Sequence, residues 1–242
     1  MTQNIYDNAG FFQGYGRLPR SMQGLDGAPE WPALRALLPA LRGLRVLDLG
    51  CGFGWFCRFA RQQGAASVLG IDVSERMLAR AEAETSDPAI SYQRADLERL
   101  TLASNSFDVA YSSLALHYIA NLEALLACVH TALANGAAFV FSAEHPIYTA
   151  PANPGWLDTD GRKTWPVDRY LDEGPRTTDW LAKGVIKQHR TIATYFALLR
   201  RSGFAVTHID EWGPSSEQVA AQPDLAPERE RPPFLLVACV RA

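Results

Sequence analysis

One short stretch constrains the fold more than any other part of this 242-residue chain. Residues 46–49 form an apolar run interrupted by Asp48, glycines follow at 50, 52 and 54, and apolar residues at helical spacing resume after Trp55. A continuous apolar run is typical of a buried strand, and glycines let the backbone turn sharply and approach a ligand closely. The N-terminus of a helix attracts anionic groups. The stretch therefore predicts a strand, a ligand-binding loop and a helix at the edge of an α/β sheet.

Strands and helices alternate along the rest of the chain. Strands are predicted for residues 44–49, 67–71, 90–94, 107–112, 138–142, 204–212 and 234–240. Helices are predicted for residues 29–41, 54–63, 121–136 and 191–201, and after Ser74. Alternation at this spacing calls for right-handed crossovers between the strands of a mostly parallel sheet.

The composition excludes several classes of protein. The formal net charge is −3 and there is no long basic run, so we expect no nucleic-acid partner. The four cysteines show no paired spacing, so we expect no metal site and a reducing, cytoplasmic location. No apolar run reaches the roughly 18–20 residues that span a bilayer, and the N-terminus lacks the pattern of a signal peptide. We expect no membrane span, and a monomer or homodimer.

Polar side chains follow the predicted strands. Asp72 ends the second strand, Asp96 follows the third, and Ser112 and Ser113 end the fourth. In a doubly wound sheet the carboxyl ends of the strands lie at one edge, where ligands bind. One carboxylate there can accept both hydroxyls of a ribose, and a second can accept from an exocyclic amine. Apolar side chains able to flank a base are those of Val73, Met77 and Leu97.

The glycine loop is a poor dinucleotide fingerprint, because Trp55 stands in the place of the third glycine. The spacing of Asp48 and the three alternate glycines instead resembles that of class I S-adenosylmethionine-dependent methyltransferases. The resemblance covers residues 43–146 well and residues 191–242 more weakly. It implies a Rossmann-like α/β fold with a doubly wound, mostly parallel seven-stranded sheet and an antiparallel last strand.

The resemblance also implies the cofactor, S-adenosylmethionine, and its product, S-adenosylhomocysteine. It implies that the loop carries the methionine part, that Asp72 holds the ribose and that Asp96 faces the adenine amine. Asp48 either hydrogen-bonds the N–H groups of the loop or contacts the ligand. The residues expected at the cofactor on the main domain are Asp48, Gly50, Cys51, Gly52, Gly54, Asp72, Val73, Met77, Ala95, Asp96, Leu97, Ser112 and Ser113.

Two histidines are candidates for a general base. His117 lies just past the fourth strand and His145 just past the fifth. Imidazole titrates near neutrality and can take a proton from a hydroxyl or amine acceptor. Each has a structural alternative, because His117 could be a packed helix residue and residues 144–146 a turn that orders the loop.

Residues 147–190 break the alternation with several prolines and tryptophans. A loop this long in a compact domain is usually functional, and its aromatic side chains would give an apolar acceptor a concave site. We therefore predict a cap over the acceptor site; the alternative is a small subdomain or a subunit interface. The residues expected on the acceptor side are Tyr118, Glu144, Tyr148, Trp156 and Trp165.

Residues 1–42 are expected to form an N-terminal arm and a helix within a single methyltransferase domain that spans residues 1–242. The arm is rich in glycine, glutamine and aromatic residues. It either packs its aromatic side chains on the domain or forms a lid over the ligand loop, where Tyr15 and Arg20 would contact the cofactor.

The expected activity is methyl transfer to a small-molecule acceptor by in-line displacement. Residues 112–118 resemble the branch that contains quinone, sterol and other small-molecule methylators. The fourth strand is not followed by the Asn/Asp-Pro-Pro-aromatic sequence of amino-adenine and amino-cytosine methylators. A non-catalytic sensor of S-adenosylmethionine remains an alternative, as does a methyltransferase for nucleic acid or protein.

Overall fold

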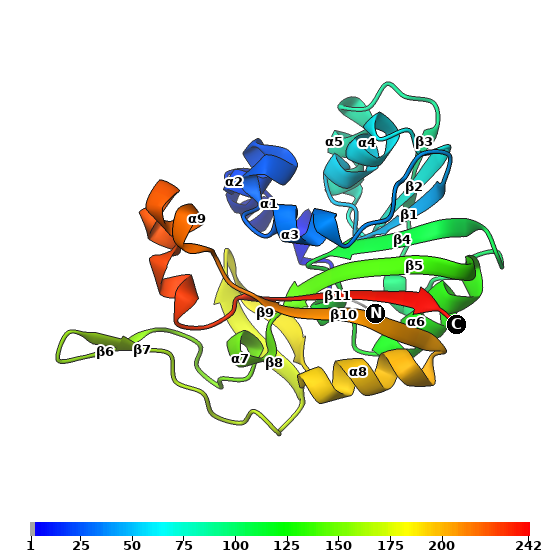
Figure 1. The fold of residues 1–242 in the computed structure, drawn as a ribbon. Coiled ribbons are helices and arrows are strands. Elements are labelled where there is room, and N and C mark those ends of the chain that lie inside the picture. Colours follow the sequence, from blue (N-terminus) through cyan, green and yellow to red (C-terminus); the bar gives the residue numbers. More distant parts are fainter. Residues whose placement is uncertain (1–2) are drawn as a thin grey trace.

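A seven-stranded sheet forms the centre of the computed structural model, which describes residues 3–242 (Figure 1). Its strands are β1 (Arg45–Leu49), β2 (Ser67–Asp72), β3 (Ile90–Arg94), β4 (Phe107–Ser113), β5 (Leu133–Glu144), β10 (Phe204–Trp212) and β11 (Phe234–Arg241). They lie in the order β10-β11-β5-β4-β1-β2-β3. The last strand, β11, is antiparallel to both β5 and β10, whereas the other neighbouring pairs are parallel. The predicted fold class is confirmed.

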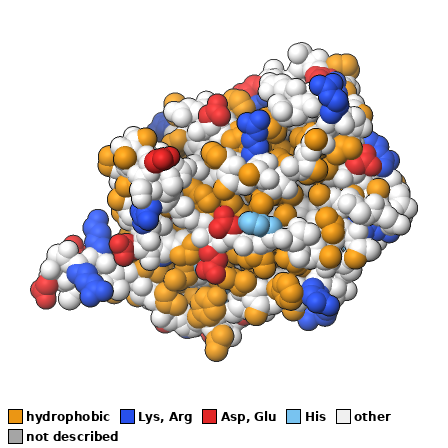
Figure 2. Space-filling model, in the orientation of Figure 1, with side chains coloured by type: hydrophobic (Ala, Val, Ile, Leu, Met, Phe, Trp, Pro, Cys, Tyr) orange, Lys and Arg blue, Asp and Glu red, His pale blue; other side chains and the backbone are white. Residues whose placement is uncertain are grey.

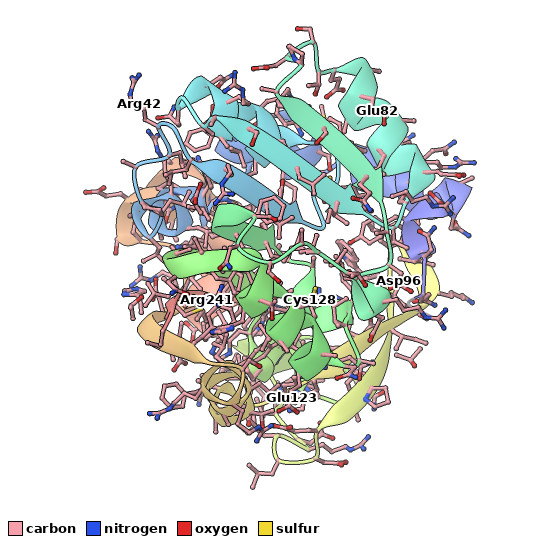
Figure 3. All side chains as sticks on the ribbon, turned by 90° about the vertical axis from the view of Figure 1, so that its right-hand side faces the viewer. Arg42, Glu82, Asp96, Glu123, Cys128 and Arg241 are labelled. Carbon is pink, nitrogen blue, oxygen red and sulfur yellow. The ribbon has the colours of Figure 1, made fainter. Side chains whose placement is uncertain are left out.

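The chain changes direction within the sheet beside β1. It runs outward from β1 through β2 to β3, then crosses to β4, which pairs with the other side of β1, and continues to β5. Ligands bind at such a switch point, at the carboxyl ends of the strands. Figure 3 shows Asp96, which follows β3, on the opposite side of the molecule from Arg42 and Arg241, which lie at the amino ends of the parallel strands.

Helices cover both faces of the sheet (Figure 1). One face carries α3 (Trp31–Ala36), α4 (Trp55–Gln62) and α5 (Glu75–Ala83), and the other carries α6 (Leu122–Ala132) and α8 (Ile192–Arg201). Each layer has its own apolar core. On the first face the ring of Phe56 stacks on that of Tyr111 with centroids 3.6 Å apart. This packing fixes α4, and with it the preceding glycine loop, against β4.

The largest differences from the predicted boundaries lie at the end of α3 and around Gly136, where β5 begins at Leu133 instead of residue 138. The helix predicted for residues 29–41 ends at Ala36, because Leu38 precedes Pro39 and the residue before a proline disfavours helical geometry. Gly136 does not close a helix; α6 ends at Ala132, and Gly136 lies within β5 with a φ of 74°. The register of β4 with β5 shifts between Leu133 and Ala138, the stretch that contains this glycine.

Segments predicted as irregular contain structure of their own. Residues 146–189 form α7 (Pro146–Thr149) and two hairpins, β6 (Leu157–Thr159) with β7 (Arg162–Thr164) and β8 (Gly174–Trp180) with β9 (Ala182–His189). The β6–β7 hairpin extends away from the sheet (Figure 1). The late loop contains α9 (Ser216–Ala221) and η5 (Pro223–Arg229), and the short turns η3 (Leu97–Arg99) and η4 (Leu116–Tyr118) follow β3 and β4.

The N-terminal arm is a series of short helical turns. They are η1 (Ile5–Asp7), α1 (Ala9–Gly16), α2 (Pro19–Met22) and η2 (Gly24–Gly27). Residues 1 and 2, which belong to the predicted arm, lie outside the described residues. Over residues 3–242, no helix combines the length and the apolar character needed to cross a bilayer.

Candidate active site

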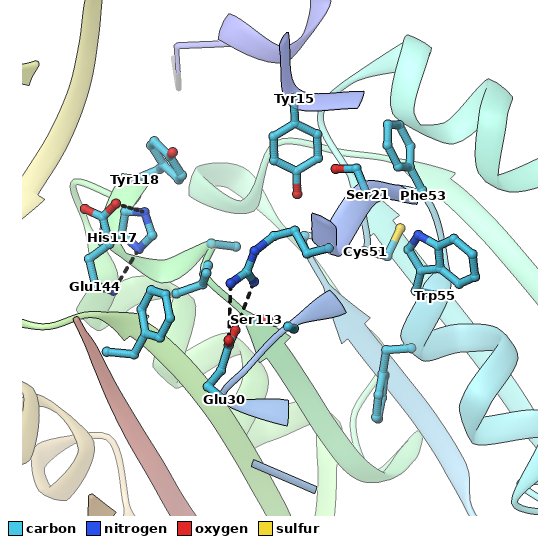
Figure 4. A pocket seen from close by; sticks show the side chains of 18 of the residues that line it. Tyr15, Ser21, Glu30, Cys51, Phe53, Trp55, Ser113, His117, Tyr118 and Glu144 are labelled. Carbon is cyan, nitrogen blue, oxygen red and sulfur yellow. Dashed lines mark hydrogen bonds and ion pairs between the residues drawn. The ribbon is translucent and has the colours of Figure 1, made fainter. Parts of the chain in front are cut away.

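A cavity of about 430 Å³ opens at the carboxyl ends of β1, β2 and β4. The glycine loop and the ends of neighbouring strands form one side, and the N-terminal arm, the β8–β9 hairpin and the start of β11 form the rest. Figure 4 shows Cys51 and Trp55 on one side of this space, with His117 and Glu144 across from them. The residues that line the cavity come from segments spread over the whole chain.

The glycine loop shapes the cavity through its backbone. The N–H groups of Gly50 and Cys51 both donate to the carbonyl of Ile71, at 2.8 and 3.0 Å, and this ties the loop to β2. Gly50 has a φ of 75°, and a Cβ there would lie 2.5 Å from the Cβ of Ala115. A Cβ on Gly52 would meet nothing within 4 Å. The loop therefore needs a glycine at position 50 for close packing and leaves open space above position 52.

Asp72 joins the two loops that follow β1 and β2. One carboxylate oxygen accepts from the N–H of Gly52 and the other from the N–H of Ser74, each at 2.9 Å. The side chain lines the cavity and is only 8% exposed. Burial raises its pKa, although the hydrogen bonds from the backbone act in the opposite direction. The carboxylate is thus rigidly placed and able to accept further hydrogen bonds from a ligand.

Asp48 lies deeper than Asp72. It is 2% exposed, and burial raises its pKa to about 7. The thiol of Cys57 donates to it at a sulfur–oxygen distance of 3.2 Å. This contact gives Asp48 a structural partner, and the side chain also forms part of the cavity lining.

Most residues expected at the cofactor do line the cavity. These are Tyr15, Arg20, Asp48, Gly50, Cys51, Gly52, Asp72, Val73, Met77, Asp96, Leu97 and Ser113. The residues outside the lining are Gly54, Ala95 and Ser112. Ser112 is fully buried and its hydroxyl donates to the carbonyl of Leu49, so it joins β4 to β1. Asp96 accepts from the N–H of Glu98 at 3.1 Å and thereby caps η3.

Arg20 does not present a free cation to the cavity. Its guanidinium donates to both carboxylate oxygens of Glu30, at 2.9 and 3.2 Å (Figure 4). Glu30 is 1% exposed and was not identified from the sequence. The two opposite charges cancel, so the pair gives the cavity a polar surface without net charge.

An aromatic wall encloses the side of the cavity that faces the arm and the β8–β9 hairpin. Besides the expected Tyr118 and Tyr148, it contains Tyr6, Trp31, Trp180, Trp212 and Phe234. Trp180 belongs to the 147–190 segment, whose aromatic side chains were expected at the acceptor site. The other four residues belong to no motif, and aromatic content by itself does not show which rings face a common cavity.

His117 and Glu144 form a buried polar group beside this wall. The backbone N–H of Glu144 donates to Nδ1 of His117 at 3.3 Å, and Nε2 of the same ring lies 4.0 Å from Oε1 of Glu144. Lys187, itself 3% exposed, pairs with that same carboxylate oxygen. Burial lowers the pKa of His117 to about 4. His117 is therefore a neutral ring at physiological pH.

Three further expected residues, His145, Trp156 and Trp165, lie outside the cavity lining. His145 accepts from the N–H of Ile147 at 3.0 Å through Nδ1, and its Nε2 lies 3.1 Å from Glu211. Both ring nitrogens are thus engaged in the turn after β5, which agrees with the structural alternative. Trp156 and Trp165 pack against the guanidinium of Arg231, which lies 5.2 and 4.0 Å from their ring centroids.

Comparison with solved structures identifies the family. A crystal structure described as an S-adenosylmethionine-dependent methyltransferase from Mesorhizobium loti is 61% identical, with a TM-score of 0.87 over 90% of this chain and 100% of that chain. This chain belongs to the S-adenosylmethionine-dependent methyltransferases. A second structure, from Listeria monocytogenes, is 40% identical over 89% of this methyltransferase and 99% of that chain, with a TM-score of 0.82. A model of the methyltransferase domain matches residues 47–141.

Relatives with named acceptors align with only part of this methyltransferase. A malonyl-[acyl-carrier protein] O-methyltransferase from Pectobacterium atrosepticum is 35% identical over 57% of this chain and 53% of its own length. A ubiquinone biosynthesis O-methyltransferase from Sinorhizobium medicae is 36% identical over 41% of each chain. A Haemophilus influenzae protein is 33% identical over 97% of this chain and 95% of its own length.

S-adenosylmethionine is the cofactor of this family, and the cavity fits it. Open space lies above Gly52, beside the Asp72 carboxylate. The indole N–H of Trp55 is buried without a hydrogen-bond partner among residues 3–242, and Trp55 lines the cavity. Gly54 offers no side chain to cap the N-terminus of α4, so the N–H groups of the first turn can bind an anion such as a carboxylate.

Proposed function

We propose that this methyltransferase acts on a small-molecule acceptor that binds in the aromatic half of the cavity. The proposal rests on the lining of the cavity, which has two chemically different sides. Glycine-loop and strand-end residues line one side, whereas aromatic rings from the arm, the β8–β9 hairpin and β11 line the other. A concave site with apolar walls and few polar groups is typical of small-molecule binding.

On the cofactor side, each residue has a distinct task in this proposal. When bound, S-adenosylmethionine supplies a methyl group on a sulfonium, for in-line displacement by the acceptor. Asp72 would accept from the ribose hydroxyls and Asp96 from the adenine amine. The glycine loop and the start of α4 would hold the amino-acid tail. On the acceptor side, the aromatic wall would exclude water and hold the nucleophile in position.

The charge distribution argues against a polyanionic acceptor. On the face shown in Figure 2, Lys and Arg side chains are scattered among hydrophobic and acidic ones and form no continuous basic track. Nucleic-acid binding depends on such clusters of positive charge. Among the named relatives, the ubiquinone biosynthesis O-methyltransferase, which aligns with 41% of this chain, supports a small-molecule acceptor.

A labelling experiment tests the proposal. The protein is incubated with methyl-labelled S-adenosylmethionine and a cell extract that is afterwards separated into metabolite, protein and nucleic-acid fractions. We expect label in the metabolite fraction, and much less there when the Asp72→Asn variant is used at the same cofactor concentration. Label confined to the protein or nucleic-acid fraction would contradict a small-molecule acceptor.

A further inference from the structure

Glu144 lies on the acceptor side of the cavity and has one carboxylate oxygen without a hydrogen-bond partner among residues 3–242. Among the residues described, Lys187 pairs with its Oε1, whereas its Oε2 is buried and has no hydrogen-bond partner. The side chain is 14% exposed and lines the cavity. A buried carboxylate oxygen without a donor is costly. A ligand that brings a hydrogen-bond donor would remove this cost.

The position of Glu144 favours contact with the reacting end of an acceptor. Glu144 ends β5, two residues beyond Ser142, which pairs with Ser113 at the end of β4. Ser113 lies at the switch point and forms part of the cavity lining. The carboxylate therefore stands next to the strand end expected to run beside the reacting methyl group, and Tyr118 and Tyr148 flank the same space.

The other candidates for a proton acceptor are already occupied. Because Nδ1 of His117 accepts from the backbone N–H of Glu144, the neutral ring carries its proton on Nε2 and has no lone pair to offer. Glu30 is held at both oxygens by Arg20. Glu228 pairs with Arg231 at 2.9 Å. Asp48, Asp72 and Asp96 follow β1, β2 and β3, on the cofactor side.

We infer that Glu144 accepts the proton of a hydroxyl or amine acceptor, an inference that rests on the proposed function. The acceptor oxygen or nitrogen donates its lone pair to the methyl carbon, and the bond from that carbon to sulfur breaks with its electron pair left on sulfur. The proton leaves the acceptor for Oε2 of Glu144 and then passes to solvent. Proton, methyl group and electron pairs balance without an oxidant or a metal.

The same geometry selects against carboxylate acceptors. Six acidic side chains line the cavity, namely those of Glu30, Asp48, Asp72, Asp96, Glu144 and Glu228. Among the described lining residues, Arg20 is the single Arg or Lys, and Glu30 neutralises it. Lys187, the cation beside Glu144, already pairs with Oε1, so a carboxylate acceptor at Oε2 would bring no proton to donate and would meet no free cation. We therefore assign this protein to phenol-, alcohol- or amine-type acceptors.

A binding experiment with two probes of the same ring system tests the selectivity. 2-Naphthol and 2-naphthoate differ in the group that faces the polar end of the site. Their binding to protein saturated with S-adenosylhomocysteine is measured by quenching of tryptophan fluorescence. We expect at least tenfold tighter binding of 2-naphthol. In Glu144→Gln this preference should fall to about threefold or less, because Gln offers an N–H donor to 2-naphthoate and leaves Lys187 without its anionic partner.

Glu123→Gln is the matched control, since it removes the same charge from an exposed pair with Arg201, outside the cavity lining. It should keep the preference of the unaltered protein. Equal loss of preference in both variants would show that overall charge, and not Glu144, selects the acceptor, and it would overturn the inference. Equal binding of both probes to the unaltered protein would overturn it as well.

A turnover measurement separates proton transfer from binding. In the labelling experiment, Glu144→Gln should lower the rate of metabolite labelling by about 100-fold or more, while S-adenosylhomocysteine still binds with unchanged affinity. Undiminished labelling by this variant would refute the role of Glu144 and leave the small-molecule acceptor intact. Absence of metabolite labelling by the unaltered protein would instead refute the proposed function.

Discussion

Asp72 illustrates how single residues build this site. Its two carboxylate oxygens accept from the N–H groups of two different loops, and its outer surface faces the cavity. The spacing of the glycine loop and the acid after the second strand predicted a ligand contact at this residue. The sequence did not predict that Asp72 also holds Gly52 in place, because that bond depends on how the two loops approach each other.

We predict that Asp72→Asn weakens binding of S-adenosylmethionine roughly 10- to 150-fold, since hydrogen bonds to a charged group contribute about 1.5–3 kcal/mol. Isothermal titration calorimetry measures the change. Glu75→Gln is the control, because Glu75 lies on the following helix α5 and its side chain is 71% exposed. Equal affinity of Asp72→Asn and the unaltered protein would rule out the ribose contact.

The N-terminal arm shows what whole elements contribute. The hydroxyl of Tyr6 lies 3.3 Å from that of Tyr118, and the ring of Phe11 packs edge-on against Trp180 with centroids 5.5 Å apart. Asp7 anchors the arm to the start of α5 by accepting from the Ser74 hydroxyl at 2.6 Å and the Arg76 N–H at 3.2 Å. The arm thus connects the cofactor side to the β8–β9 hairpin, as a lid would.

Asp7→Ala should loosen the attachment of the arm to α5, and it tests whether the arm acts as a lid. Losing hydrogen bonds to a carboxylate shifts the arm toward open states, so we expect roughly three- to tenfold weaker binding of S-adenosylhomocysteine. We also expect faster proteolytic cleavage before residue 28. Asp26→Ala, at an exposed position of η2, is the control. If Asp7→Ala binds and resists protease as well as Asp26→Ala does, the arm only packs on the domain.

At the scale of the whole molecule, buried ionisable groups link stability to pH. Burial lowers the pKa of His117 to about 4, from the value of 6.5 that holds in an unfolded chain. Between these values the unfolded chain binds a proton that the folded protein does not, so His117 makes stability fall as the pH falls. Asp48 has the opposite effect on stability. Burial raises its pKa to about 7, so the folded protein binds a proton that the unfolded chain has already released, and Asp48 makes stability rise as the pH falls.

Comparison of variants separates these two effects. His117→Gln keeps an oxygen that can accept from the N–H of Glu144 but cannot titrate. Between pH 7 and pH 4.5, the free energy of unfolding should fall by about 2–3 kcal/mol more in the unaltered protein than in this variant. Urea unfolding at a series of pH values measures this difference. Parallel curves for the two proteins would mean that His117 titrates normally in the folded state.

The sequence by itself determined the sheet, the glycine loop and the acids at the strand ends. These features depend on local patterns, namely apolar runs, glycine spacing and the strand termini, which follow from the chain without knowledge of distant contacts. The sequence also predicted an acceptor side near β4 and β5, including Glu144 and Tyr118.

Tertiary structure alone decided which side chains meet in the cavity. Trp156 and Trp165 have the same composition signal as Trp180, yet they pack on Arg231 while Trp180 faces the cavity. His117 resembles a general base in the sequence, but burial and the N–H of Glu144 keep its ring neutral and occupied. Burial and hydrogen-bond partners arise from segments far apart in the chain, and spacing along the sequence does not specify them.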